Sequence, residues 1–156
     1  GSVGPHMSKV TGVTLGVLAL MLSCGASFAL GRVVAYEELP HSTVTSLATC
    51  GHWQIDGQSG EFRILRAYLY GGTMLFVDMV RPNEHGTWLE VTRGFTFAEL
   101  NNDHLELELS DVRCSSKGAN RIVVTGRAEP FELSPYSFTI EIDGATGAYE
   151  MKTEPK

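Results

Sequence analysis

Cys50 and Cys114 are the residues whose types and spacing predict the most definite chemistry in this chain. The chain has three cysteines, and the third, Cys24, lies in an apolar N-terminal stretch that is typical of an export segment. If that stretch is cleaved or buried in a membrane, an even pair of cysteines remains in an exported domain. We therefore predict a Cys50–Cys114 disulfide, worth ~3–4 kcal/mol through its effect on the unfolded chain. This pairing removes the free thiolate that a nucleophilic cysteine would need.

The other titratable residues show no spacing that predicts catalysis or metal binding. The histidines that follow the export segment are His41, His52, His85 and His104. No two of them are two residues apart, as a pair of ligands on one face of a strand would be. Glu106 and Glu108 would share a strand face, whereas a glycosidase needs carboxylates on opposite sides of the sugar. We therefore expect that the protein is not an enzyme and that it has no metal site and no cofactor.

Aromatic side chains are the remaining group with functional potential. They are more numerous than one buried sheet face needs, and the relevant ones are Trp53, Tyr68, Tyr70, Trp88, Phe95 and Phe97. Where no chemistry is visible, an apolar groove or surface patch is the default candidate site. We choose Tyr68, Tyr70 and Trp88 as the candidate binding surface, because the residues that alternate with them also look buried.

The elements that must position these residues begin with an N-terminal export segment. Residues 1–6 precede Met7 and are interpreted as a cloning remnant. Val10 to Gly31 contains no charged residue, and Ser27-Phe28-Ala29 places small residues where a signal peptidase recognises them. We predict that residues 7–29 are a signal peptide, cleaved after Ala29.

Two alternatives for this segment stay open. Cys24 could be lipidated, since the residues before it partly resemble a lipobox. The segment could also remain as a membrane anchor, because about 20 apolar residues suffice to span a bilayer. The expected location is therefore periplasmic or secreted, or else membrane-anchored and facing the periplasm.

After the export segment, residues 30–49 are predicted to form a linker or short element, and residues 50–156 a single β-domain. From Cys50 onward, apolar residues recur with a period of two and turn residues arrive about every ten positions. This pattern predicts an all-β fold of about eight mostly antiparallel, sequential strands, closed into a small barrel or folded into a sandwich.

Two local features are specific enough to test. A hairpin is predicted around Gly71-Gly72, with Leu69 opposite Met74 and both faces covered, because residues on both sides are apolar. A β-bulge is predicted near Ser110-Asp111, because strict alternation would otherwise place Cys114 on the outward face.

Gly51-His52-Trp53 is similar to the Gly-x-Trp with which lipocalin-like barrels begin. The match covers three residues, with no second motif. The resemblance implies a barrel that holds a small apolar ligand.

Charge limits the class of partner. From Leu30 onward the chain has 18 acidic residues against 11 lysines and arginines, a net charge of −7. An acidic chain repels phosphate backbones, so no nucleic-acid partner is expected. The sequence favours a non-catalytic envelope module that recognises another protein, such as an inhibitor, immunity protein or assembly factor. The alternative is a small β-barrel that carries an apolar ligand or lipid.

Overall fold

The computed structural model describes residues 1, 2, 4 and 31–156. The predicted signal peptide, residues 7–29, with Cys24 in it, lies outside the described residues. Among the described residues, no helix is long and apolar enough to cross a membrane.

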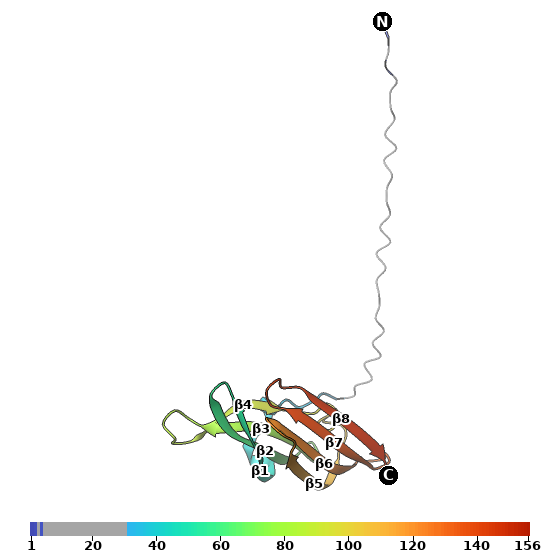
Figure 1. The fold of residues 1–156 in the computed structure, drawn as a ribbon. Helices are drawn as coiled ribbons and strands as arrows, with labels where there is room; N and C mark the ends of the chain where they lie inside the picture. The colour runs from blue at the N-terminus through green and yellow to red at the C-terminus, as the bar shows by residue number, and fades with distance from the viewer. Residues whose placement is uncertain (3, 5–30) are drawn as a thin grey trace.

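The described chain folds into two antiparallel sheets of four strands each, joined in chain order (Figure 1). The first sheet contains β1 (Val44–Ile55), β2 (Gln58–Leu69), β3 (Gly72–Pro82) and β4 (Leu89–Phe95). The second sheet contains β5 (Glu108–Ser116), β6 (Arg121–Glu129), β7 (Tyr136–Asp143) and β8 (Tyr149–Pro155). Each strand pairs with its neighbour in sequence, so both sheets are simple meanders.

The predicted all-β fold of eight antiparallel strands is confirmed, and the barrel alternative is wrong. Within residues 31–156, no strand pairing joins the two sheets, so each sheet keeps two edge strands. The molecule is a sandwich. Its inner faces are filled by apolar side chains from both sheets, including Phe62, Leu75, Val77, Ile122 and Ile140.

The Cys50–Cys114 disulfide is confirmed, and it connects the two sheets. Cys50 lies on β1 and Cys114 on β5, which are edge strands of different sheets. Their Cα atoms are 6.0 Å apart and their positions in the sequence differ by 64. The predicted bulge is also present, since β5 shifts its register on β6 between Ser110 and Arg113, with Asp111 at a φ of 53°.

The predicted β2–β3 hairpin exists, but its register was wrong by two residues. The turn is formed by Tyr70 and Gly71, both with positive φ, and Leu69 pairs with Gly72 instead of Met74. Gly72 is a glycine for another reason: a Cβ there would lie 2.7 Å from the Cα of Glu106. The shift of two residues keeps every side chain on its predicted face.

Residues 31–43, from the predicted linker, pack against the outer face of the first sheet. They include two short 3₁₀ helices, η1 (Tyr36–Glu38) and η2 (His41–Thr43), and β1 begins directly afterwards at Val44. Val34 is buried with Leu65, Ala67, Met74 and Phe76 in a second apolar cluster. Tyr36, Leu39, Val44 and Leu69 pack around it. The first sheet therefore has apolar contacts on both faces, as its sequence pattern predicted.

Candidate functional site

The outer face of the first sheet is divided into two regions. We call the region under residues 31–44 the covered half; it contains Leu65, Ala67, Met74 and Phe76. We call the rest the open half. Its apolar residues follow from the register, which places Val80 opposite Val91 and Pro82 opposite Leu89 on the same face.

A buried ion pair lies between the two halves. The Arg63 guanidinium donates to both carboxylate oxygens of Asp78, Nε to Oδ1 at 2.9 Å and Nη2 to Oδ2 at 2.7 Å. The Tyr36 hydroxyl donates to Oδ2 of the same carboxylate at 2.6 Å. Asp78 is fully buried, so these three charge-assisted hydrogen bonds compensate its desolvation. Arg63 and Asp78 lie directly opposite each other in the β2–β3 register.

The ionisation of this cluster follows from its contacts. Burial, and then the hydrogen bond to Asp78, raises the pKa of Tyr36, so its hydroxyl stays protonated at neutral pH. The hydrogen bond to Asp78 also raises the pKa of Arg63. These three hydrogen bonds converge on one carboxylate and connect η1 to β2 and β3, which indicates a structural role for this cluster.

A groove with a volume of about 720 Å³ is lined by residues of the open half, by β1 and by Ala119 and Asn120 of the β5–β6 turn. Its apolar lining includes Trp53, Val80, Pro82 and Leu89. Its polar lining includes His52, Glu61, Arg63 and Asn120. The groove is therefore an apolar strip bordered by charged and amide groups.

Trp53 forms the floor of the groove. Its indole N–H lies 3.2 Å from each of two backbone oxygens, those of Glu61 and Val80, which hold the ring in place. Gly60 makes room for this arrangement, because a Cβ there would lie 1.9 Å from the Val80 carbonyl oxygen. The position of the Trp53 ring is thus fixed by backbone groups of β2 and β3, not by flexible side chains.

The turn between β3 and β4 extends beyond the body of the first sheet (Figure 1). Asn83 organises it: its Oδ1 accepts hydrogen bonds from the backbone N–H of Thr87 at 2.7 Å and of Trp88 at 3.3 Å. Its Nδ2 donates to the Thr87 hydroxyl at 2.8 Å. Next to this ordered turn, Trp88, Leu89 and Val91 are 66%, 56% and 46% exposed. The result is a rigid projection that displays apolar side chains.

The three residues chosen from the sequence do not form one surface. Tyr68 and Tyr70 lie at the β2–β3 turn, and Trp88 lies beyond the opposite end of β3. The 11 residues of β3 separate these ends by about 35 Å. All three side chains are exposed, Tyr68 at 59% and Tyr70 at 54%. Only Trp88 adjoins the groove region.

Sequence reasoning missed Leu89, Val91 and Pro82 as surface residues. The alternation in Leu89-Glu90-Val91 places Leu89 and Val91 on one face of a strand. That face could have been compared with the outer face of β3. What alternation cannot show is that residues 31–44 cover one half of the face and leave this half open.

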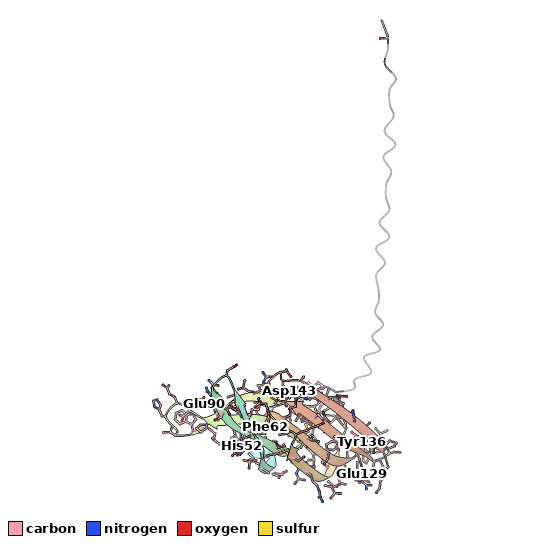
Figure 2. All side chains as sticks on the ribbon, viewed as in Figure 1. His52, Phe62, Glu90, Glu129, Tyr136 and Asp143 are labelled. Atoms are coloured by element: carbon pink, nitrogen blue, oxygen red, sulfur yellow. A yellow bond between two sulfur atoms is a disulfide. The ribbon has the colours of Figure 1, made fainter. Side chains whose placement is uncertain are left out.

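Among the described residues, the histidines meet carboxylates only in isolated pairs, His52 with Glu61 at 3.9 Å and His104 with Asp103 at 3.8 Å. Figure 2 shows His52 and Glu90 on the first sheet, and Glu129 and Tyr136 on the second. In residues 31–156, no three His, Cys, Asp or Glu side chains gather closely enough to hold a metal ion. Glu106 and Glu108 do not lie on one regular strand, since Glu106 precedes β5 with a φ of 46°.

The fold and this surface define a class: a disulfide-linked sandwich of two four-stranded meanders, with a groove on one outer face. No protein-family model, no curated protein and no solved structure matches the chain. The disulfide indicates a non-reducing environment outside the cytoplasm.

Proposed function

We propose that this protein is an exported, non-catalytic binding module that recognises another protein through the open half of its first sheet. The observation that carries the proposal is the apolar strip formed by the exposed Pro82, Leu89 and Val91 over the buried Val80, beside the exposed Trp88. Soluble proteins rarely leave such a strip beside a rigid projection without a use for it. Aromatic anchors and a desolvated apolar centre are what protein interfaces use for affinity.

The border of the strip suits a protein partner. Arg81 and Glu90 form an ion pair at 3.5 Å between β3 and β4, and His52 lies 3.9 Å from Glu61 between β1 and β2. Such charged groups at the rim contribute little affinity but exclude mismatched partners. The apolar centre with a charged border matches the anatomy of a protein–protein interface.

Export to the periplasm or beyond is part of the proposal. The apolar segment before Leu30 and the disulfide support it independently of each other. From Leu30 onward the chain has a net charge of −7, which argues against a nucleic acid as the partner. Inhibitors, immunity proteins and envelope-assembly factors meet this description, and the fold alone does not choose among them.

Comparative capture from an envelope extract tests the proposal. The oxidised protein, a Leu89→Asp variant and a Tyr68→Asp variant are immobilised, and captured proteins are identified by mass spectrometry. We expect a stoichiometric partner that is retained by the protein and by Tyr68→Asp but lost with Leu89→Asp. Both substituted side chains are exposed, so neither change should unfold the domain. A partner lost only with Tyr68→Asp would move the binding surface to the β2–β3 turn and contradict the proposal.

The groove volume favours a second candidate, an apolar small-molecule or lipid ligand. Ligand pockets typically measure about 300–1,000 Å³, and the groove falls within that range. Such a ligand would lie against Trp53 on the outer face, not inside a barrel. Uptake of a fluorescent fatty acid that Leu89→Asp abolishes, with no protein captured, would favour this candidate.

A further inference from the structure

The four edge strands of the sandwich differ in regularity. Pairing is interrupted by a register shift between β1 and β2, between β3 and β4, and between β5 and β6. β8 pairs with β7 without interruption, from Tyr149 opposite Ile142 to Pro155 opposite Tyr136. Bulges protect an edge against added strands, so among the described residues β8 is the edge best shaped to accept one.

The hydrogen-bond phase of β8 shows which backbone groups are free. Asp143 N–H donates to the Ala148 carbonyl at 2.9 Å, which makes these two residues a hydrogen-bonded pair. In an antiparallel ladder such pairs recur every second residue, so Glu150, Lys152 and Glu154 bond to β7. The backbone groups of Met151 and Thr153 therefore point away from β7. The backbone of Pro155 also points away from β7, as those of Met151 and Thr153 do. The lack of an N–H at Pro155 therefore removes no hydrogen bond to β7.

The charged side chains of one β8 strand are complementary to those of a second β8 strand that lies antiparallel to it. In an antiparallel pair of two β8 strands with Thr153 opposite Thr153, Lys152 lies opposite Glu154 of the second copy. Glu150 then lies opposite Lys156. Both charge pairs occur twice because of the two-fold symmetry. Cross-strand pairs of opposite charge stabilise a sheet, and pairs of like charge destabilise it.

Neighbouring registers are excluded by the same residues. Only outward-pointing residues can form hydrogen-bonded pairs with a second copy, so the register can change only in steps of two. One step places Lys152 opposite Lys152 and Glu150 opposite Glu154. The other places Glu154 opposite Glu154. The charges of this edge therefore disfavour both adjacent registers.

We propose that β8 is a self-association edge, at which a second copy of this chain adds antiparallel with Thr153 at the two-fold axis. The second sheet of one copy and the second sheet of the other then form one continuous sheet. Thr153 exchanges two backbone hydrogen bonds with its counterpart, and each Met151 N–H donates to the Pro155 carbonyl of the other copy. The open half lies on the first sheet, so this contact and the proposed partner site are separate. Two copies of the chain that each carry a net charge of −6 repel each other, so association strengthens as salt is added.

Charge exchange tests this contact. Two tagged forms of the full chain are mixed in a non-ionic detergent, and the co-purified fraction is measured. We expect Lys152→Glu and Glu154→Lys each to weaken association with an identical copy by at least about tenfold, because like charges then face each other. Mixing Lys152→Glu with Glu154→Lys restores opposite charges at two pairs and should recover association. The N-terminal segment is identical in all samples, so it cannot produce this pattern.

Two further variants complete the test. Thr153→Pro removes the central outward N–H without removing a bond to β7, and should abolish association while the domain stays folded by circular dichroism. Arg113→Glu, an exposed charge reversal on β5 at the opposite edge of the same sheet, should leave association unchanged. Association that is absent in the unsubstituted chain, or is unaffected by the β8 variants, would overturn the proposal. A mixed pair that associates no better than its parents would do the same.

Discussion

The covered half and the open half of the first sheet are built on the same strands but end in different surroundings. In the covered half, Leu65, Ala67, Met74 and Phe76 are at most 5% exposed, because residues 31–44 close over them. In the open half, Leu89 and Val91 keep about half of their surface in contact with solvent. The chain thus completes a second small core over one half and stops at the Arg63–Asp78 pair. The apolar strip beyond that pair is not covered by residues 31–44, and it is the surface on which the proposed binding function rests.

The largest expected effect is in the covered half. Phe76→Ala removes a fully buried ring that packs edge-on against Tyr36, with ring centroids 6.3 Å apart. We expect the free energy of unfolding to fall by about 3–5 kcal/mol, as for other buried aromatic residues replaced by alanine. Urea unfolding followed by circular dichroism measures this.

Val91→Ala is the matched control in the open half. It removes an exposed side chain from β4, so the free energy of unfolding should change by less than about 1 kcal/mol. Equal losses from the two substitutions would remove the distinction between the halves.

The next effect concerns the boundary between the halves. Tyr36→Phe keeps the ring but removes the hydroxyl that donates to Asp78, and so isolates one hydrogen bond to a charged group. We expect a loss of about 1.5 kcal/mol in the free energy of unfolding. Tyr149→Phe removes a hydroxyl that donates to the exposed Glu99, and it should cost less. If the order of the two losses were reversed, the Asp78 cluster would not be what secures residues 31–44.

A smaller effect on stability, but a large one on binding, is expected for Leu89→Ala. The side chain is exposed, so unfolding should be within about 0.5 kcal/mol of the unsubstituted protein. Affinity for the captured partner should fall at least about tenfold if Leu89 is an anchor of the interface. Titration calorimetry measures the affinity, with Tyr68→Ala as the control. Unchanged affinity would place the interface elsewhere.

The local alternation of apolar residues predicted the strands well. It could not show whether the strands close into a barrel or form two layers. The alternation of apolar residues depends only on which face of a strand is buried. Whether eight strands close into a barrel or form two layers depends on which distant strands pair. In this chain β4 is followed by a connection to β5 in which Leu107 is buried and Asn101 bonds to the backbone of Leu75. Nothing in the local pattern reports those long-range contacts.

The two differences between the predicted and the observed structure, at the β2–β3 turn and in residues 31–43, have similar physical causes. Gly71-Gly72 suggested a two-glycine turn, yet Gly72 is required by the close approach of Glu106, which is distant in sequence. Residues 31–43 belong to the stretch 30–49, which the sequence predicts as a linker or short element because it shows no regular period. Their apolar residues, such as Val34 and Leu39, pack as an irregular cover that only the folded sheet defines. The exposed positions of Tyr68, Tyr70 and Trp88 could be anticipated, but their separation along β3 depended on the turn positions.

The smallest expected effect distinguishes the floor of the groove from its projecting end. Trp53 is 3% exposed and Trp88 is 66% exposed, so a neutral quencher such as acrylamide should reach almost only Trp88. Trp88→Phe should therefore lower the quenching of the folded chain several-fold, without a change in stability. Strong quenching that survives in Trp88→Phe would mean that solvent reaches the indole of Trp53. The hydrogen bonds from that indole to Glu61 and Val80 would then not hold in solution, and the rigid floor on which the open half depends would be lost.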